Sequence, residues 1–539
     1  MDKIKLSFYF VLLTAGVVQA QVNRYMVFFT DKTGTPHTIS NPGTYLSPAA
    51  IERRESQNII ITESDLPLTP VYVQSVQSTG VTVVHKTKWM NGILVECTSS
   101  DLSDIEALSF VSSIELVAPG AVPAPGGKKK SHKMRTSSTE SVATADQLSM
   151  LGLDEMHADG FRGEGIILAV FDGGFQGANV TIPFQHVFNE ARFNASVSHD
   201  FVSDNSNVFV YDSHGTQVWS VIGAYQDGTF IGGAYNSEFQ LYITEDVDSE
   251  YRIEEYNWLF AAERADSAGV DIINTSLGYN TFDDSQMDYA KTDMDGSTAV
   301  IARAAQLAAS KGIFLVSSAG NSGNDPSWQI ITSPADGEDV LAVGNVNSAG
   351  MRSTSSSIGP SADGRIKPDV MALGAGTTVI KANGSVGTGN GTSFASPLAA
   401  SLVAGLWQKY PNLTNQELLE AIRNSASQSF SPDNFLGYGI PHYRAVSNFL
   451  DQQNQQNIVE VFPNPVTDMI TIRPRSPEEV GFTDLQLINA QGQTIDQRSV
   501  SYNWLDNEYT ANLSAVSAGI YFLKVQVGTQ FYLYKVVKQ

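Results

Sequence analysis

Short apolar runs alternate with helical stretches through the middle of the chain. The helical stretches, 253–268 and 297–311, carry alanine-rich apolar faces. The apolar runs cover residues 166–171, 271–274, 313–316 and 340–343. Strands buried on both faces of a sheet have such continuous runs, and their alternation with helices is typical of βαβ units. The pattern predicts an α/β fold with a doubly wound parallel sheet over residues 145–450, with functional residues at the carboxyl ends of its strands.

A smaller α+β unit is predicted before this domain, over residues 21–118. Its strand-like runs and helical segments cover residues 24–29, 47–58, 81–84, 92–96 and 100–108. From residue 119 the composition changes to Pro, Gly, Lys and Ser without apolar periodicity. Residues 119–144 are therefore predicted to be a protease-accessible linker. The alternative interpretation of its basic cluster is a patch that binds an anionic surface.

The last part of the chain has a different pattern. Runs of alternating aromatic and β-branched residues, separated by turn residues, predict a small antiparallel β-sandwich over residues 458–539. These runs cover residues 459–466, 469–472, 485–489, 519–525 and 531–536. The Gln- and Asn-rich stretch 451–457 is expected to be a polar linker between the α/β domain and the sandwich.

Residues 1–20 have the features of a secretory signal peptide. Two lysines precede the apolar run 8–18, and Val18 and Ala20 are the small residues at positions −3 and −1 of the expected cleavage site. This apolar run is too short to span a bilayer, and no later run is long enough to do so. The sequence therefore predicts an exported protein without a transmembrane segment. The alternative for this stretch is a buried N-terminal strand or helix.

Composition narrows the function classes further. Hydrophobic residues at 42% and charged residues at 17% indicate globular domains. The formal net charge of −23 argues against a nucleic-acid partner, because phosphate binding needs a basic face. The one cysteine, Cys97, can form neither an internal disulfide nor a thiolate metal cage.

Four residues in separate segments have side chains suited to acyl transfer: Asp172, His214, Asn321 and Ser393. A serine is a weak nucleophile unless a base removes its proton, and an imidazole base needs a carboxylate that fixes its tautomer and stabilises its charge. Three of these residues also have an ordinary structural interpretation: the aspartate as a turn former, the histidine as a turn residue and the serine as a helix N-cap. The complete set, in the chain order Asp, His, Ser, favours the catalytic interpretation.

Ser393 lies at the start of a helix predicted over residues 392–410. Free N–H groups and the helix dipole at this end favour developing negative charge. Pro397 lacks the amide that would bond the carbonyl of Ser393, so an irregular first turn is expected. The glycines before the serine let the backbone approach the reacting group closely. A phosphate-binding loop is the weaker alternative, because no P-loop lysine follows.

These segments resemble, in order and context, the signature sequences of the subtilisin-like serine peptidases, or subtilases. Further similarity lies at residues 273–278, 332–335 and 367–372. The resemblance implies a secreted serine endopeptidase with Asp172, His214 and Ser393 as its catalytic triad. It also implies that the Asn321 side chain and the Ser393 N–H bind the oxyanion. The residues expected to flank the substrate are Ser276, Leu277, Gly278, Ser318, Ala319 and Gly320.

The sequence departs from the subtilase pattern at three places. Phe394 stands where many relatives have methionine, Gln217 where they often have a second histidine, and Gly173-Gly174 where Thr/Ser-Gly is commonest. None of these changes removes a catalytic atom, so an active enzyme is expected rather than an inactive subtilase-fold binding scaffold. The resemblance implies no cofactor for the chemistry. Structural calcium occurs in the family, but the sequence assigns no metal ligand.

The flanking units take their expected roles from position and resemblance. Residues 21–118 lie where subtilases carry an inhibitory, chaperone-like prodomain, and the maturation cut is expected within the linker 119–144. The tail resembles the C-terminal sorting domains of type IX secretion cargo in Bacteroidetes, through Pro463-Asn464-Pro465 and Gly519-Ile520-Tyr521. This implies the type IX secretion machinery as a partner, passage through the periplasm and an extracellular or cell-surface location. The resemblance to subtilases implies protein or peptide substrates. The alternative for the tail is an adhesive or carbohydrate-binding module.

Overall fold

The computed structural model divides into two compact units, Met1–Tyr443 and Arg444–Gln539, which are described separately. The structure describes residues 21–120, 143–456, 459–474, 482–489, 493–495, 501–505, 508–527 and 530–539. The predicted signal peptide, 1–20, and most of the predicted linker 119–144 lie outside these residues.

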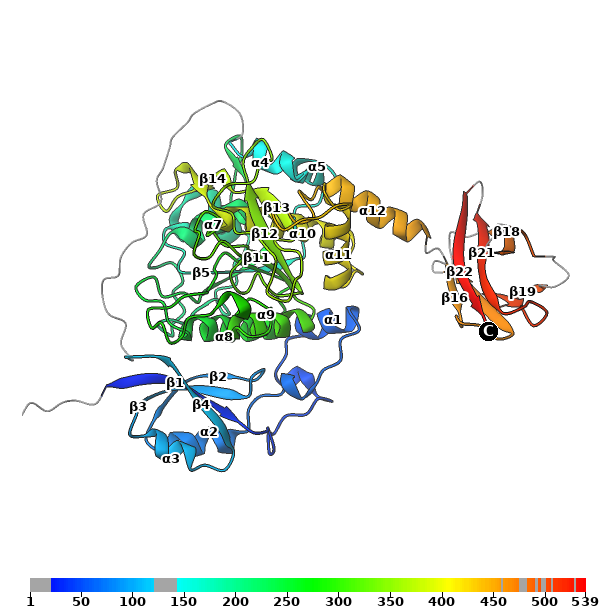
Figure 1. The fold of residues 1–539 in the computed structure, drawn as a ribbon. Helices are drawn as coiled ribbons and strands as arrows, with labels where there is room; N and C mark the ends of the chain where they lie inside the picture. Colours follow the sequence, from blue (N-terminus) through cyan, green and yellow to red (C-terminus); the bar gives the residue numbers. More distant parts are fainter. Residues whose placement is uncertain are drawn as a thin grey trace, which may run out of the picture. The chain divides into compact units, whose positions relative to one another are not determined.

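A seven-stranded parallel sheet forms the centre of the first unit (Figure 1). The strand order is β13-β12-β11-β10-β5-β9-β6, and each neighbouring pair is parallel. The strands are β5 (Ile167–Asp172), β6 (His199–Asp200), β9 (Glu238–Ile243), β10 (Ile272–Thr275), β11 (Phe314–Ser318), β12 (Val340–Val346) and β13 (Val370–Leu373). The predicted α/β fold with a doubly wound sheet is confirmed.

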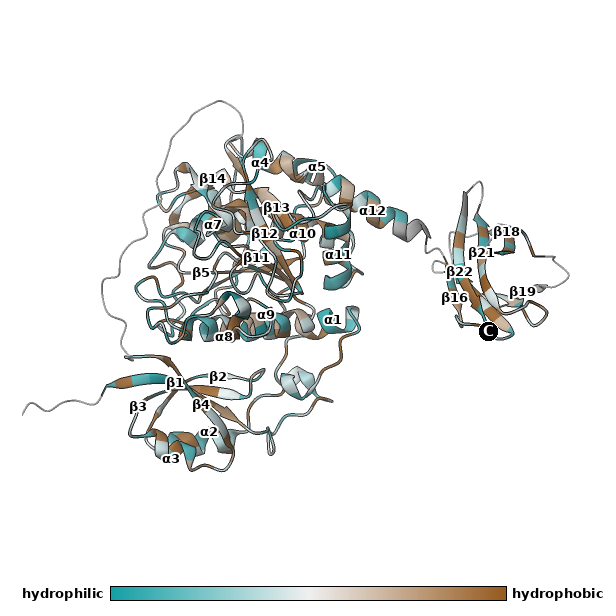
Figure 2. Ribbon diagram, in the orientation of Figure 1, coloured by the Kyte–Doolittle hydropathy of each residue, from teal (hydrophilic) through white to brown (hydrophobic). Residues whose placement is uncertain are grey.

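Helices cover both faces of this sheet, which explains the continuous apolar runs. On one face lie α8 (Ile253–Ala268) and α9 (Val300–Ser310), and on the other α7 (His214–Gly223) and α10 (Thr392–Lys409) (Figure 1). Every residue of β10, β11, β12 and β13 is buried, and Figure 2 shows β12 and β13 as largely apolar. The other elements of this domain include α4 (Ala145–Met150), α5 (Leu153–Ala158), α6 (Gln185–Asn189), α11 (Asn415–Ser425), and the hairpin of β14 (Ala375–Ile380) and β15 (Val386–Asn390).

The N-terminal lobe, residues 21–120, is built on a four-stranded antiparallel sheet in the order β2-β3-β1-β4. Its elements are β1 (Val22–Phe29), α1 (Pro48–Ser56), α2 (Pro70–Gln77), β2 (Thr82–Thr87), β3 (Gly92–Thr98), α3 (Leu102–Glu106) and β4 (Val111–Ala118). Alternate residues face opposite sides of a strand. Val27 and Val95 pack toward α2 and α3, whereas Met26 and Leu94 join the hydrophobic core around α8 and α9. The lobe therefore shares a core with the α/β domain (Figure 1).

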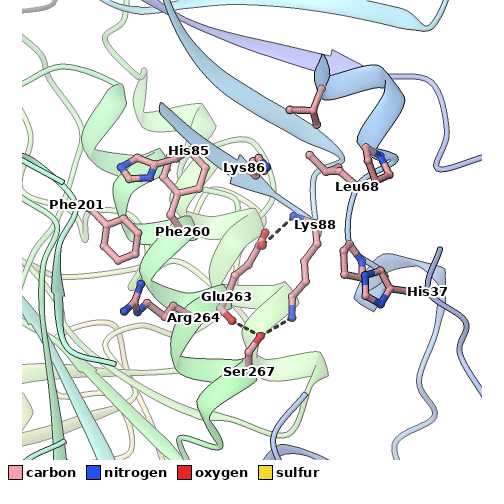
Figure 3. A pocket seen from close by; sticks show the side chains of 13 residues that line it. His37, Leu68, His85, Lys86, Lys88, Phe201, Phe260, Glu263, Arg264 and Ser267 are labelled. Atoms are coloured by element: carbon pink, nitrogen blue, oxygen red, sulfur yellow. Dashed lines mark hydrogen bonds between the residues drawn. The ribbon is translucent and has the colours of Figure 1, made fainter. Parts of the chain in front are cut away.

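A cavity of about 490 Å³ remains between the lobe and α8 (Figure 3). The rings of Phe201 and Phe260 form part of its lining, next to His85 of β2. Polar groups at its edge are paired across the interface. The Glu263 carboxylate accepts hydrogen bonds from the backbone N–H of Lys88 at 2.8 Å, and Lys88 Nζ donates to Ser267 Oγ at 2.8 Å.

A buried cluster of charges also joins the lobe to the α/β domain. Arg54 of α1 lies 3.0 Å from Asp65 and 2.9 Å from Asp266 of α8. Arg53 also pairs with Asp266, and Lys311, just after α9, lies 3.2 Å from Asp65. Burial alone would raise the pKa of Asp266, but the surrounding cations lower it to about 2. Asp266 is thus held charged by Arg53 and Arg54 from the lobe, whereas Asp65 has one cation from each side of the interface, Arg54 and Lys311.

The second unit contains a β-sandwich of two antiparallel sheets around one buried cluster. The first sheet, in the order β16-β17-β20-β19, has β16 (Val459–Phe462), β17 (Met469–Pro474), β19 (Ser501–Leu505) and β20 (Glu508–Asn512). The second, β18-β21-β22, has β18 (Phe482–Asn489), β21 (Gly519–Val527) and β22 (Gln530–Lys538). The predicted antiparallel sandwich is confirmed, although β19 and β20 were not expected from the sequence.

The predicted polar linker 451–457 differs from the structure. Helix α12 (Tyr443–Gln456) continues through residues 451–456, and residue 457 lies outside the described part of the chain. Glutamine has a favourable helix propensity, so the Gln-rich stretch can extend a helix that has already started.

Replacing Arg54 tests the buried charge cluster. Arg54→Met removes the buried cation that contacts both Asp65 and Asp266, while Lys311 still pairs with Asp65 and Arg53 with Asp266. Because removing one partner from a buried ion pair is costly, we expect the free energy of unfolding, measured by chemical denaturation, to fall by about 3 kcal/mol. Arg24→Met is the control, because Arg24 pairs with Glu96 at 3.0 Å where both side chains are partly exposed. Its expected cost is below about 1 kcal/mol. Equal losses in the two variants would contradict a special role for the cluster.

Candidate active site

Asp172 and His214 form a direct hydrogen-bonded pair. Asp172 is the last residue of β5 and is fully buried, and His214 is the first residue of α7. His214 Nδ1 lies 2.9 Å from Asp172 Oδ1 and 3.0 Å from Oδ2. This contact places the Nδ1 proton toward the carboxylate and leaves Nε2 to act as the base. A Cβ at Gly215 would lie 2.5 Å from the Gly174 carbonyl oxygen, so glycine is needed for this close approach.

Further negative charge surrounds the His214 imidazole. Burial alone would lower the pKa of His214, but the Asp172 charge and hydrogen bond, with the charges of Glu245 and Asp212, raise it to about 9. Glu245 follows β9, the strand next to β5, and Ile243 is in register with Asp172. The carboxyl edge of the sheet therefore brings Glu245 beside the pair. The sequence analysis did not identify this residue.

Ser393 lies in the first turn of α10, where its side chain contacts the end of β10. Its hydroxyl donates to the carbonyl oxygen of Ser276 at 3.2 Å, and Ser276 Oγ donates to the Ser393 carbonyl oxygen at 2.9 Å. The Phe394 ring lies 5.6 Å from the His214 ring, between ring centroids. The start of helix α10 thus lies beside His214 through Phe394, and the Ser393 hydroxyl bonds to Ser276. The hydrogen bond between a nucleophile and its base often tightens only when substrate binds.

Asn321 is held against the same helix start. Its side-chain Oδ1 accepts hydrogen bonds from Thr392 N at 2.9 Å and from Thr392 Oγ1 at 3.1 Å. With the acceptor engaged, the group that Asn321 can offer to a ligand is its Nδ2 donor. Asn321 is exposed, so its Nδ2 group is accessible to a ligand. Thr392 was not singled out in the sequence analysis because its role arises from this tertiary contact.

The two segments expected to flank the substrate end on neighbouring parallel strands. Ser276, Leu277 and Gly278 follow β10, and Ser318 ends β11 before Ala319 and Gly320. The hydrogen bonds of Ser276 join the first segment to Ser393, and Gly320 N donates to Thr392 Oγ1 at 3.3 Å. The structure thus brings the predicted residues together at one edge of the sheet.

A buried polar chain supports Ser276 from behind. Ser396 Oγ donates to Asn274 Oδ1 at 2.8 Å, and Asn274 Nδ2 donates to Ser276 Oγ at 3.3 Å. The signal that could have identified Asn274 is a polar residue inside an otherwise apolar, fully buried strand.

The described residues contain neither a cluster of metal ligands nor a helix that could span a membrane. Among them, no group of three or more His, Cys, Asp or Glu side chains is arranged to hold a metal ion. No helix in the described part of the chain combines the length and the apolar composition needed to cross a membrane.

Three protein-family models match the chain. Residues 163–439 match the Subtilase family, and residues 24–135 match the Peptidase S8 propeptide domain of Bacteroidota. Residues 460–539 match the Secretion system C-terminal sorting domain. The chain therefore carries a subtilase propeptide domain and a tail that marks it for type IX secretion to the extracellular space or the cell surface.

Individual relatives agree with the family models. Subtilisin from Bacillus pumilus is 31% identical over 281 residues, which is 52% of this chain and 90% of that protein. Subtilisin NAT from Bacillus subtilis subsp. natto is 30% identical over 281 residues, which is 52% of this chain but only 65% of the relative. The crystal structure of the epidermin leader peptide processing serine protease from Staphylococcus aureus covers 80% of this chain and 98% of its own, with a TM-score of 0.54. At 16% identity, this last match supports the fold alone.

The Subtilase family match covers slightly more than half of the chain. It includes the four residues that the sequence analysis singled out for acyl transfer: Asp172, His214, Asn321 and Ser393. With the parallel sheet and the paired Asp172 and His214 at its carboxyl edge, the assignment rests on both sequence and geometry. The chain belongs to the subtilase family of serine-type peptidases.

Proposed function

We propose that the protein is a secreted serine endopeptidase in which Asp172, His214 and Ser393 act as a catalytic triad. The observation that carries this proposal is the 2.9 Å contact between His214 Nδ1 and Asp172 Oδ1, next to the helix start that holds Ser393. Peptide-bond hydrolysis needs an activated nucleophile, and this is the arrangement that activates a serine.

The reaction proceeds by acyl transfer. His214 Nε2 removes the proton from Ser393 Oγ as the oxygen attacks the substrate carbonyl carbon, and the protonated imidazole then donates to the leaving amine. The same base activates the water that hydrolyses the acyl-enzyme. Asp172 orients the imidazole and stabilises its charge.

The oxyanion is bound by Asn321 Nδ2 and the backbone N–H of Ser393. The orientation of Asn321 supports this role, because both hydrogen bonds from Thr392 engage its oxygen. A donor aimed at charge that develops only in the transition state lowers the barrier without holding the substrate more tightly.

The units on either side of the catalytic domain act in maturation and in secretion. Residues 21–118 are an inhibitory, chaperone-like prodomain, and maturation cuts the linker within residues 119–144. The catalytic domain spans 145–450, and residues 458–539 bind the type IX secretion machinery. The family matches to the propeptide and sorting domains support these roles. Substrates are proteins or peptides.

Ser393→Ala should lower kcat by about 10⁶-fold, because the triad residues act as a unit. The linker should also stay uncut in this variant if maturation is autocatalytic, as electrophoresis and N-terminal sequencing would show. Ser401→Ala, which removes a hydroxyl bonded to the Pro397 carbonyl on the same helix, is the control and should keep full activity. Substantial peptidase activity in purified Ser393→Ala would refute the assignment.

Glu245→Gln tests the electrostatics at His214. The base must be neutral, so kcat/KM should rise with pH through the His214 pKa, on the alkaline side of an ordinary imidazole. Because the Glu245 charge helps to raise that pKa, its removal should move this limb of the pH profile to lower pH. Glu238→Gln, at the opposite end of β9, is the control and should leave the limb in place. A limb that moves to higher pH would contradict the assigned base.

Deleting residues 458–539 should impair secretion but not peptidase activity. The first unit is compact by itself, so the purified truncated enzyme should keep its kcat/KM. In the native host, we expect the truncated protein to accumulate in the periplasm, as measured by cell fractionation. Normal release into the medium would refute the sorting role, and loss of binding to an insoluble substrate would favour the adhesive or carbohydrate-binding alternative.

A further inference from the structure

The space between the two substrate-flanking segments faces the proposed nucleophile. Ser276, at the start of one segment, bonds directly to Ser393, and Asn321 directly follows the other segment. A substrate carbonyl that reaches Ser393 Oγ with its oxygen at Asn321 must therefore lie between the segments. The side chain of the residue that carries this carbonyl, on the acyl side of the scissile bond, would then enter the space between Gly278 and Gly320.

Two hydroxyl groups lie at the base of this space. A Cβ on Gly278 would lie 2.2 Å from Thr332 Oγ1, and a Cβ on Gly320 would lie 3.0 Å from the same oxygen. Ser357 Oγ would be 2.9 Å from the Cβ on Gly320. Thr332 Oγ1 therefore stands between the two walls, and both walls must be glycine at these positions.

The backbone on both sides fixes Thr332 in place. Its N–H donates to the Ala319 carbonyl at 3.3 Å, and the next residue, Ser333, pairs with Tyr279 through backbone hydrogen bonds of 2.9 and 3.3 Å. Thr332 is thus connected to both substrate-flanking segments. A bulky substrate side chain cannot displace it without breaking these contacts.

The Thr332 hydroxyl has no hydrogen-bond partner within the described structure, although the residue is only 5% exposed. Ser357 Oγ, in contrast, accepts a hydrogen bond from Ser322 N at 3.1 Å. Buried hydroxyls are nearly always paired, and this one has its hydrogen-bonding capacity available to a group that enters the space.

We propose that Thr332 and Ser357 close the subsite for the residue on the acyl side of the scissile bond and restrict it to short side chains, with alanine and serine preferred. The Thr332 methyl and hydroxyl groups exclude large side chains, and the Thr332 hydroxyl pairs with that of a substrate serine. This inference rests on the proposed peptidase function and adds its substrate class.

The test uses the mature enzyme and peptides that differ only at this residue: Ala, Ser, Leu or Phe. We expect kcat/KM for Ala and Ser to exceed that for Phe by at least about tenfold. Thr332→Gly, with Thr332→Ala as the milder variant, should raise the Phe-to-Ala ratio by about tenfold or more. Thr332→Val keeps the volume but removes the hydroxyl, so it should lower the Ser-to-Ala ratio.

Thr377→Val is the control, because Thr377 is also buried but its hydroxyl bonds to the Leu373 carbonyl away from the site. It should leave all ratios unchanged. Labelling of Ser393 by a phosphonyl fluoride distinguishes a failure of this inference from a failure of the proposed peptidase function. A labelled, active enzyme that cleaves after Phe or Leu as well as after Ala would overturn this inference alone, as would a Thr332→Gly variant with the wild-type ratio. An enzyme that is neither labelled nor active would overturn the proposed function and this inference with it.

Discussion

The site depends on keeping one carboxylate charged in the interior. Asp172 is fully buried at the end of a central strand, where an isolated charge would be strongly disfavoured. Its partners are the Gly173 N–H at 2.9 Å and the His214 imidazole, and Gly215 gives the room for α7 to start there. The buried Asp172 carboxylate needs hydrogen-bond partners. This need accounts for the position of α7 and for the raised pKa of His214.

The carboxyl edge of the parallel sheet carries both the groups proposed to bind the substrate and the groups proposed to react with it. Because β5, β9, β10 and β11 run in the same direction, residues distant in sequence meet where the strands end. Asp172, Glu245, Ser276 and Asn321 all follow this rule. Helix α10, which packs on β10 to β13, supplies Ser393, and its Thr392 orients Asn321. Binding groups and reacting groups are thus placed by the same backbone geometry.

The sequence predicted four strands of the parallel sheet from their continuous apolar runs and missed β9, in which a polar residue interrupts the run. Strands β5, β10, β11 and β12 appear as apolar runs because both faces are covered. Strand β9 includes Gln240, which hides the pattern, yet Gln240 is buried and bonded to Tyr242. Within the site, local motifs identified Asp172, His214, Asn321 and Ser393. Glu245, Thr392 and Thr332 could not be identified in this way, since their roles come from contacts between distant segments.

The core shared by the lobe and helices α8 and α9 affects how the chain acquires its structure. These helices bury one side on the sheet and the other against Met26, Trp89 and Leu94. The lobe precedes both helices in the chain, so in an exported protein it crosses the inner membrane before them and can fold around its own core. When α8 and α9 emerge, a complementary apolar surface already exists, and the slow assembly of a parallel sheet can start from a template.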